Sequence, residues 1–464
     1  MDDSPPNGGP LSTRRVLRMW WPLAASWLLM SLELPAVSAV VARLADPEIN
    51  LAAYGGVVYP LSLIVEAPII MLLAASTALS KDVASYNKLR RFMMRSGALL
   101  TALHLLVALT PLYDVVVRGV IGAPAEIVEP ARLGLLIMTP WTWSIAYRRF
   151  NQGLLIRFDQ SRAVGVGTAV RLGSNGLVLA VGYAIGSIPG IVVATAAVAT
   201  GVVSEAVYIG VRVRPVVRGP LAEAPPVEPP LTFREFTAFY VPLALTSLLS
   251  LLIQPIGSAA LSRMPLALES LAAWPVLSGL GFLFRSPGIA YNEVVVALFD
   301  RPRAVKTLRR FALALALAPS ALLLLVAATP LGTFWLRDVS ALSPALTEMS
   351  RPALWLLLPL PGLIALQSWY QGAIVASRRT RGVTEAILVF LLTTALVLGA
   401  GVIWGQVAGL YVGLAAFSLA TLTQTAWLWA RSRPVIRAAE AEAEVEVEAG
   451  EIAPRPQPAE TAGR

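Results

Sequence analysis

The chain has 464 residues, of which 56% are hydrophobic and only 14% are charged, and its mean hydropathy is +0.68. This composition excludes a soluble globular protein, and the lack of cysteine excludes disulfides, thiolate metal sites and redox pairs. The formal net charge of +9 would suit a nucleic-acid-binding protein, but the placement of the basic residues favours another explanation.

Apolar stretches that are long enough to cross a bilayer recur along most of the chain. A helix of about 20 apolar residues spans a hydrocarbon core roughly 30 Å thick. In chain order, we predict spans over residues 19–42, 52–79, 93–115, 132–156, 163–186, 189–211, 236–262, 268–298, 311–329, 352–376, 383–404 and 406–430. The sequence therefore predicts an all-α, polytopic membrane protein with twelve transmembrane helices.

The basic residues are divided unequally between the two sides of these spans. The N-terminus, the even-to-odd loops and the C-terminus carry 24 Lys and Arg residues. The opposite loops carry only Arg43, Arg118, Arg132, Arg263, Arg337 and Arg351. Because Lys and Arg are retained on the inner side, both termini are predicted to be cytoplasmic, in a multi-pass protein of the plasma (inner) membrane. The positive charge thus marks topology, and we expect no nucleic-acid partner.

Two segments lie outside the predicted spans. The stretch PVVRGPLAEAPPVEPP is rich in proline and predicts a cytoplasmic linker. The C-terminal stretch is acidic and poor in aromatic residues, which predicts a disordered, solvated tail, with a docking role as the alternative. The predicted divisions are an N-terminal tail (1–18), a first six-helix lobe (19–214), the linker (215–231), a second six-helix lobe (232–432) and the disordered tail (433–464).

The two halves of the chain resemble each other in sequence. "PLAASWLL" at Pro22 matches "PLALTSLL" at Pro242, and the same offset of 220 joins Arg43 to Arg263. "LRRF" occurs in both halves at an offset of 219. Each half has an even number of spans, so both enter the membrane in the same direction and are related by a pseudo-two-fold axis along the membrane normal. This is the architecture of a two-lobed transporter.

Glu33 is an ionisable residue deep inside the first predicted span. A charge at this depth costs several kcal/mol unless it faces water or a partner, which indicates a functional role. Pro35 has no N–H and frees the carbonyl of Ser31 from its helical hydrogen bond. A carboxylate beside a free carbonyl suits a proton or a small cation. The alternative is a Glu33 that is neutralised by a neighbouring helix and serves only packing.

An acid and a base occupy corresponding parts of the second and eighth spans. The offset of 220 places the neighbourhood of Glu66 opposite Arg285 and Ser286. If the pseudo-axis runs between these helices, Glu66 and Arg285 form an ion pair, either one that breaks during alternating access or a static one. His104, the only histidine, also lies within a span and is a candidate for proton transfer or for packing alone.

Further polar residues lie on other predicted spans: Arg148 in the fourth, Arg171 and Asn175 in the fifth, and Arg285 and Asn292 in the eighth. Asn175 follows Arg171 by four residues, so the two share a helix face. The halves differ at the fourth span, where Gln367 corresponds to Arg148. Arg148 is therefore a candidate for binding an anionic substrate, unless its side chain extends to the cytoplasmic face instead.

No enzyme signature occurs in the sequence. It has no phosphate-binding loop that ends in Lys-Ser or Lys-Thr, no pair of metal-binding histidines and no soluble domain large enough for an ATPase. We therefore predict a non-enzyme without a resident cofactor, in which an H⁺ or Na⁺ gradient, or the gradient of the substrate itself, provides the energy.

The twelve spans in two parallel halves, the proline-bent first span with its acid, and Gln-Gly at the ends of the fourth and tenth spans resemble the MATE-type fold of the multidrug, oligosaccharidyl-lipid and polysaccharide exporter superfamily. The stretches "MWWPLA", "FYVPLAL", "INLAAYG" and "EAPI" are most similar to the progressive ankylosis proteins. The resemblance covers roughly residues 15–432.

This resemblance implies export by alternating access, with a cavity between the lobes that is lined by the first, second, seventh and eighth helices. Those helices carry Glu33, Glu66, Gln254 and Arg285. Multidrug members use acids of the first lobe for H⁺ or Na⁺ coupling, a role that Glu33 fills by position. Ankylosis-type members release small anions such as pyrophosphate, nucleotide or citrate, which arginines within the membrane would suit.

We therefore predict a monomeric secondary active transporter, an exporter, that moves a small organic and anionic solute across the lipid bilayer. One alternative is a flippase for a lipid-linked saccharide, although such flippases often have two further helices. The alternatives outside transport are a channel and an intramembrane enzyme that modifies lipid.

Overall fold

The computed structural model describes residues 11–301, 304–377 and 381–452. Within these residues every regular element is a helix. Ten helical segments of this part of the chain are long and apolar enough to cross a membrane. Helices α8 and α19, with 33 and 44 residues, also exceed the roughly 20 residues that a span requires. The prediction of an all-α polytopic membrane protein is confirmed.

The helices fall into two series, with π-helices labelled η. The first lobe contains α1 (Thr13–Ser31), α2 (Glu33–Val41), α3 (Pro47–Ala52), η1 (Ala53–Val58), α4 (Tyr59–Glu66), α5 (Leu72–Leu79), α6 (Val83–Leu109), α7 (Leu112–Asp114), η2 (Val115–Ile121), α8 (Ala125–Arg157), α9 (Ser161–Ile185) and α10 (Gly190–Arg218). The second lobe contains α11 (Phe233–Leu261), α12 (Ala267–Ile289), α13 (Tyr291–Leu298), α14 (Ala304–Ala328), α15 (Leu331–Thr333), η3 (Phe334–Val339), α16 (Pro344–Leu357), α17 (Pro359–Ala376), α18 (Arg381–Trp404) and α19 (Gly409–Ile452).

The internal repeat extends to the backbone. Helices α1 and α11 begin 220 residues apart, and α10 and α19 begin 219 residues apart. The residues that precede the second and eighth spans, Asp46 and Leu266, both have a positive φ, of 50° and 55°. The glycines that end α9 and α18, Gly186 and Gly405, have φ of 69° and 61°. Because helix ends and left-handed turns recur at an offset of 219 or 220 residues, the two lobes are copies of one structural unit.

The two lobes meet at a contact between equivalent residues. A Cβ atom on Gly55 would lie 2.7 Å from a ring carbon of Pro275, so only glycine fits there. The two positions are related by the repeat offset of 220, and equivalent residues touch each other only beside a two-fold axis. The pseudo-axis therefore passes between η1 and α12.

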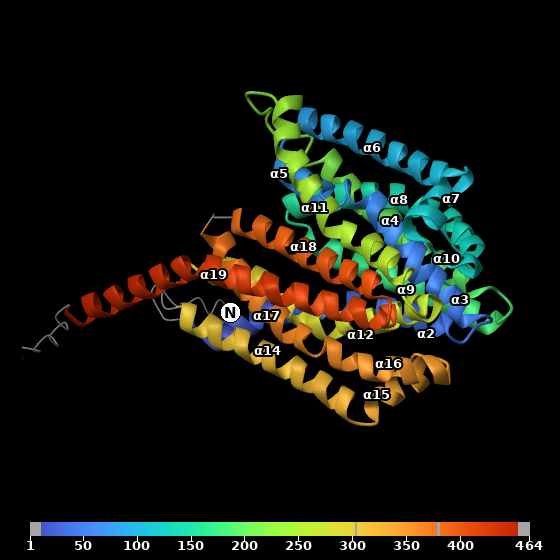
Figure 1. Cartoon of the computed structure of the whole chain (residues 1–464). Coiled ribbons are helices and arrows are strands. Elements are labelled where there is room, and N and C mark those ends of the chain that lie inside the picture. Colours follow the sequence, from blue (N-terminus) through green and yellow to red (C-terminus); the bar gives the residue numbers. More distant parts are fainter. Residues whose placement is uncertain (1–10, 302–303, 378–380, 453–464) are drawn as a thin grey trace, which may run out of the picture.

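The first helix of each lobe crosses to the other lobe. Helix α1 packs against α12, α13 and α14, and α11 packs against α4 and α5, beside which it lies in Figure 1. The Trp20 indole donates a hydrogen bond to the carbonyl of Pro287 at 2.9 Å, and the Tyr240 hydroxyl donates one to the carbonyl of Pro68. These two bonds are equivalent under the repeat, so the crossing is symmetric.

The first span is broken at Leu32, next to Glu33. Helix α1 ends at Ser31 and α2 begins at Glu33, and Pro35 has no N–H to donate to the Ser31 carbonyl. The predicted effect of Pro35 is thus visible as a break in the helix. In the second lobe, α11 continues without a break through Pro255, the residue equivalent to Pro35.

The predicted ends of the lobes need correction. Helix α10 continues through Pro215 to Arg218, so the linker is shorter than predicted, and α1 begins at Thr13, within the predicted N-terminal tail. The expected disorder from residue 433 is wrong as far as Ile452, where α19 ends. Alanine and glutamate, which dominate this stretch, have high helix propensity and favour continuation of the helix. The rest of the predicted tail, 453–464, lies outside the described residues.

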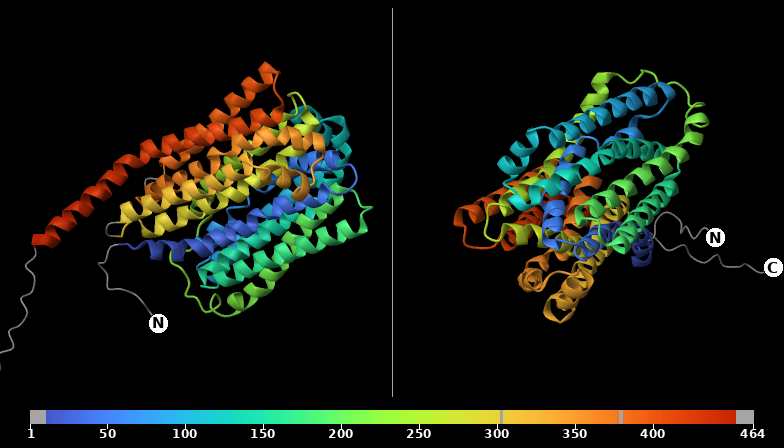
Figure 2. Two further views of the ribbon diagram at one scale, coloured as in Figure 1. Left: turned by 90° about the horizontal axis from the view of Figure 1, so that it is seen from below. Right: turned by 90° about the vertical axis from the view of Figure 1, so that its right-hand side faces the viewer.

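The extension of α19 projects beyond the other helices in Figure 1 and in the left view of Figure 2. At its base, Arg309 of α14 forms an ion pair with Glu440 of α19 at 3.0 Å. This ion pair lies at the same end of the bundle as the N-terminus of α14.

The linker is attached to the first lobe through Asp82. One carboxylate oxygen of Asp82 accepts a hydrogen bond from the Ser85 amide at 2.8 Å and caps α6, and the other accepts from the Val227 amide at 3.0 Å. Burial opposes ionisation of this carboxyl, but the hydrogen bonds outweigh it and lower the pKa of Asp82 below its ordinary value. Asp82 is therefore ionised at neutral pH and connects α6 to the linker.

Candidate functional site

A buried ion pair lies at the centre of the first lobe. Arg148 of α8 contacts Glu205 of α10, with 2.5 Å between Nη1 and Oε2. The Gln152 amide, one turn further along α8, donates to the other Glu205 oxygen at 2.9 Å. The side chain of Glu205 has no exposed surface, and Arg148 and Gln152 are also buried. Burial of a charge at this depth is tolerated only with such a partner, so Arg148 does not extend to the membrane face.

Glu33 belongs to the same network. Its carboxylate lies 3.3 Å from Nη2 of Arg171 and accepts a hydrogen bond from the Asn175 amide at 3.0 Å. Nε of Arg171 also lies 3.6 Å from the carboxylate of Glu205. The spacing of four residues on α9 places Arg171 and Asn175 side by side, as predicted from the sequence. The network therefore connects α2, α8, α9 and α10.

Glu66 extends this network from α4. It is buried, and its Oε2 atom has no hydrogen-bond partner among the described residues. The cations whose charges act on it are Arg149, Arg148 and Arg171. Three carboxylates thus share one region of the lobe with three guanidinium groups, so the network is neutral when all six groups are ionised.

The predicted ion pair between Glu66 and Arg285 does not occur among the described residues. Helix α4 packs against α8, so Glu66 faces the arginines of its own lobe. Arg285 lies at the equivalent position of the other lobe. Residues that are related by the repeat occupy equivalent positions in the two lobes, but they touch each other only beside the pseudo-two-fold axis. Gly55 and Pro275 meet this condition.

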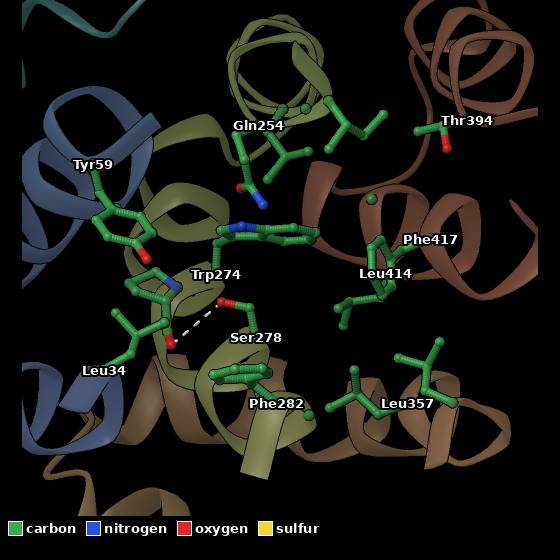
Figure 3. A pocket seen from close by; sticks show the side chains of 18 of the residues that line it. Leu34, Tyr59, Gln254, Trp274, Ser278, Phe282, Leu357, Thr394, Leu414 and Phe417 are labelled. Atoms are coloured by element: carbon green, nitrogen blue, oxygen red, sulfur yellow. Dashed lines mark hydrogen bonds between the residues drawn. The ribbon is translucent and has the colours of Figure 1, made fainter. Parts of the chain in front are cut away.

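A cavity of about 280 Å³ lies between the lobes. The first lobe contributes Leu34, Gly55, Tyr59 and Leu63, and Figure 3 shows Leu34 and Tyr59 on one side of the cavity. The second lobe supplies most of the wall, from α11, α12, α18, α19 and the region where α16 meets α17. Apolar side chains such as Leu357, Leu414 and Phe417 dominate it, in a form typical of small-molecule sites.

Arg285 is the charged residue in this wall. Its guanidinium lies 4.9 Å from the ring centroid of Phe417 and 5.4 Å from that of Phe282. In the part of the chain that the structure describes, no carboxylate forms an ion pair with Arg285. The polar wall residues Gln254, Ser278 and Thr394 are neutral (Figure 3). A cation in an apolar cavity without a counter-ion attracts an anionic ligand.

Tyr59 of α4 belongs to the cavity wall and also lies near the ionic network. It lines the cavity, as does Leu63, one turn further along α4. Glu66 follows Leu63 by three residues and so lies on the same side of the helix. The charges of Glu33 and Glu66 both act on Tyr59.

Two arginines connect the lobes at the end of the bundle that carries few basic residues. Arg43, just after α2, donates to the carbonyls of Val339 at 2.9 Å and Asp338 at 2.6 Å, at the end of η3. Arg263, just after α11, donates to the carbonyl of Ile121 at 2.7 Å, at the end of η2. Each arginine satisfies carbonyls that a helix end leaves free. We call this symmetric pair the arginine clamp.

No family model matches the sequence, and no curated protein matches it significantly. Solved structures do match. An inward-facing multidrug resistance MATE family transporter of the MOP superfamily superposes with a TM-score of 0.67 at 15% identity, over 89% of this chain and 98% of that one. The chain has the MATE transporter fold.

Two further structures show the same fold. An outward-facing multidrug resistance MATE family transporter gives a TM-score of 0.61 at 14% identity, over 92% of this chain and 96% of that one. The lipid II flippase MurJ, in an inward closed conformation, gives 0.60 at 14% identity, over 90% of both chains. At such identities the likeness establishes the MATE fold, while the substrate is inferred from the site.

The MATE fold separates the residues singled out in the sequence. Glu33, Glu66, Arg148, Arg171 and Asn175 meet in the first lobe, and Gln254 and Arg285 line the cavity. Asn292 of α13 lies apart from both, where its amide donates to the Ser368 carbonyl at 3.3 Å. His104 is buried against Thr142 and the carbonyl of Leu135, at 3.1 Å and 2.9 Å, an arrangement that suits packing.

Sequence reasoning missed Glu205 and Tyr59. Glu205 is a carboxylate within the apolar run TGVVSEAVYIG, so the depth argument used for Glu33 would have found it. Tyr59 carries no comparable signal, because a tyrosine in a membrane span is common and its place at the cavity depends on the packing of α4.

Proposed function

We propose that this protein is a secondary active exporter of a small organic anion, and that it works by alternating access of the cavity between its lobes. The observation that carries the proposal is Arg285, a guanidinium in an apolar cavity that has no carboxylate partner among the described residues. In such surroundings an anionic group of a ligand would gain far more from Arg285 than it would in water. The similarity of short motifs to progressive ankylosis proteins, which release small anions, agrees with this choice of substrate.

Glu33 is the proposed coupling residue. Its carboxylate is held by Arg171 and Asn175, and a proton or Na⁺ that bound there would weaken the contact with Arg171. Arg171 would then retain Glu205 alone as a partner. The free carbonyl of Ser31 lies next to this carboxylate in the chain and offers a further ligand for a small cation. Gradient energy would therefore enter at Glu33.

The break at Leu32 provides a route from Glu33 to the movement of the lobes. Helix α1 packs on the second lobe, whereas α2 packs on α9 and α10 of the first lobe. Any change at Glu33 thus acts on the joint between two helices that belong to different lobes. We propose that this joint bends when the cavity changes sides, a hinge movement of a few residues.

We propose that the arginine clamp holds the lobes together at one end in this conformation and so closes that end of the cavity. The distribution of Lys and Arg predicts that this end faces outward, with both termini in the cytoplasm of a plasma-membrane protein. We propose that the clamp opens in the outward-facing state and that its two halves act equally, since the repeat relates them. A monomer contains the whole cavity and the whole clamp.

A flippase for a lipid-linked saccharide is the second candidate. It is supported by the fold shared with the lipid II flippase MurJ and by the leucine-rich cavity wall, which would accept an acyl chain. A phosphate-linked lipid would also be attracted to Arg285. The two candidates differ in whether the substrate is soluble in water.

Transport by purified protein in liposomes would test the proposal. We expect accumulation of carboxylate or phosphate-bearing anions, loss of this transport in Arg285→Gln, and partial retention in Arg285→Lys, which keeps the charge. Arg234→Gln, a change of the same kind at an exposed residue outside the cavity, should transport normally. Transport of cationic drugs with equal efficiency in the wild type and in Arg285→Gln would refute the anion proposal, and translocation of labelled lipid alone would favour the flippase.

A further inference from the structure

A second cavity lies at the basic end of the second lobe, away from the site described above. It has a volume of about 250 Å³ and is formed by α14, α17 and α19, which pack against one another. Three arginines line it: Arg309 of α14 and Arg433 and Arg437 of α19. Its remaining wall is largely aromatic or apolar and includes Trp429 and Leu366. We call it the basic pocket.

The charges of the basic pocket are not balanced. Glu440 forms an ion pair with Arg309 at 3.0 Å, and among the described residues neither Arg433 nor Arg437 forms an ion pair. The guanidinium of Arg433 lies 3.4 Å from the centroid of the Trp429 indole. Two cationic groups beside an exposed indole therefore remain available to an anion at the level where membrane headgroups lie.

An apolar path leads from the basic pocket toward the middle of the bundle. Leu313 of α14 lines the pocket and is 47% exposed. Leu317, one turn further along the same helix, is 71% exposed. A ligand with a charged head at the arginines and an apolar chain along α14 would match both parts of this surface.

Comparison with the first lobe shows why the basic pocket is open only in the second lobe. Its equivalent arginines, Arg90, Arg214 and Arg218, are all present. The residue equivalent to Trp429 is Gly210, however, and a Cβ atom there would lie 2.6 Å from the hydroxyl of Tyr147, the counterpart of Leu366. Tyr147 thus fills the space that is open in the second lobe. The arginines are common to both lobes, and the open pocket depends on Leu366.

We propose that the basic pocket binds the phosphate headgroup of an anionic phospholipid, with one acyl chain along α14. A lipid is favoured over free phosphate because the exposed leucines continue the pocket along the membrane-facing side of the helix. Arg433 and Arg437 hold the phosphate, and Arg309 contributes when it is released from Glu440. The role is independent of the solute that the central cavity transports.

Native mass spectrometry of the full-length protein, titrated with phosphatidylglycerol or phosphatidylcholine, tests this proposal. We expect wild-type protein to retain phosphatidylglycerol preferentially, and Arg433→Gln with Arg437→Gln to weaken its binding roughly 25-fold, from about fivefold for each arginine near a membrane surface. The matched control is Arg214→Gln with Arg218→Gln, the same charge change at the equivalent positions of the first lobe, which should leave binding unchanged.

Leu366→Tyr provides a second variant that keeps every charge and places the residue of the first lobe in the basic pocket. It should weaken phosphatidylglycerol binding at least as much as removal of one arginine, even if the double arginine variant fails to fold. Equal retention of both lipids by wild-type protein would overturn the proposal, as would equal weakening by the first-lobe control. Displacement of the lipid by inorganic phosphate at millimolar concentration would show that free phosphate is the ligand and would likewise overturn it.

Discussion

The two lobes share a backbone but differ in their interiors. The first lobe holds an ionic network, and the second lobe has uncharged residues in place of five residues that take part in it. The replacements are Ile253 for Glu33, Gln367 for Arg148, Phe390 for Arg171, Thr394 for Asn175 and Gln424 for Glu205. The second lobe instead forms most of the wall of the cavity, with Arg285 at the position of Glu66. A duplicated scaffold thus carries the ionic network in one lobe and most of the cavity wall in the other.

The first spans of the two lobes also differ, because only the span of the first lobe is interrupted. Pro35 and Pro255 are equivalent, yet only the span that carries Glu33 breaks, while α11 continues through Pro255. Proline alone is therefore insufficient to break the helix. The carboxylate of Glu33, held by α9, accompanies the break and places it beside the ionic network.

The largest expected change in stability comes from replacing Glu205 by glutamine, the residue that the second lobe has at the equivalent position. Glu205→Gln leaves Arg148 and Arg171 near an uncharged side chain, and loss of one partner of a buried ion pair costs about 3–5 kcal/mol. We expect a matching loss of stability in thermal unfolding of the purified protein. Adding Arg148→Gln, which completes the pair Gln367 and Gln424 of the second lobe, should recover most of it. Equal stability of Glu205→Gln and wild type would show that the network is unimportant for folding.

A smaller effect is expected at the axis between the lobes. Gly55→Ala places a methyl group 2.7 Å from the Pro275 ring, and overpacking of this kind costs about 1–3 kcal/mol. Gly176→Ala is the matched control, because no atom lies within 4 Å of its added Cβ and alanine favours a helix. Thermal unfolding should rank Gly55→Ala below wild type and the control at or above it. The opposite ranking would mean that the lobes are not in close contact at this point.

Substitutions in the arginine clamp test whether its two arginines contribute equally to the contact between the lobes. The chain contains no cysteine, so Leu261→Cys in the cavity wall provides a single labelling site. Loss of a charge-assisted hydrogen bond of about 1.4 kcal/mol in Arg43→Gln should raise labelling by an impermeant thiol reagent about tenfold from the outer side. Arg263→Gln should raise it to the same extent. A large effect of one variant and none of the other would contradict the symmetric clamp.

The smallest effect concerns the attachment of the linker to the first lobe. Asp82→Ala removes the cap of α6 and should cost about 1 kcal/mol at neutral pH. Since the pKa of Asp82 is lowered in the folded protein, its contribution is complete above the ordinary carboxyl pKa of about 4 and is lost as the pH falls through the lowered value. The stabilities of wild type and variant, measured from pH 7 to pH 3, should therefore converge at the acid end. A constant difference across this range would exclude an ionised Asp82 as its source.

The sequence was sufficient for the features that depend on pattern. Apolar runs predicted the spans, the repeated motifs predicted the two copies, and Pro35 predicted a disturbance beside Glu33. It was insufficient for contacts, because equivalence under the repeat places Glu66 and Arg285 at matching sites that face different neighbours. The acidic tail was misjudged as far as Ile452, since its composition favours both solvation and helix.

The proposed division of labour between the lobes is tested most directly by gradient-driven uptake of a carboxylate or phosphate-bearing anion into proteoliposomes containing wild type, Glu33→Gln or Glu129→Gln. Imposed pH and Na⁺ gradients should drive accumulation by the wild type and by Glu129→Gln, a change at an exposed carboxylate. Glu33→Gln should still exchange anion across the membrane but lose its response to either gradient. An unchanged gradient response in folded Glu33→Gln would contradict coupling at the first lobe.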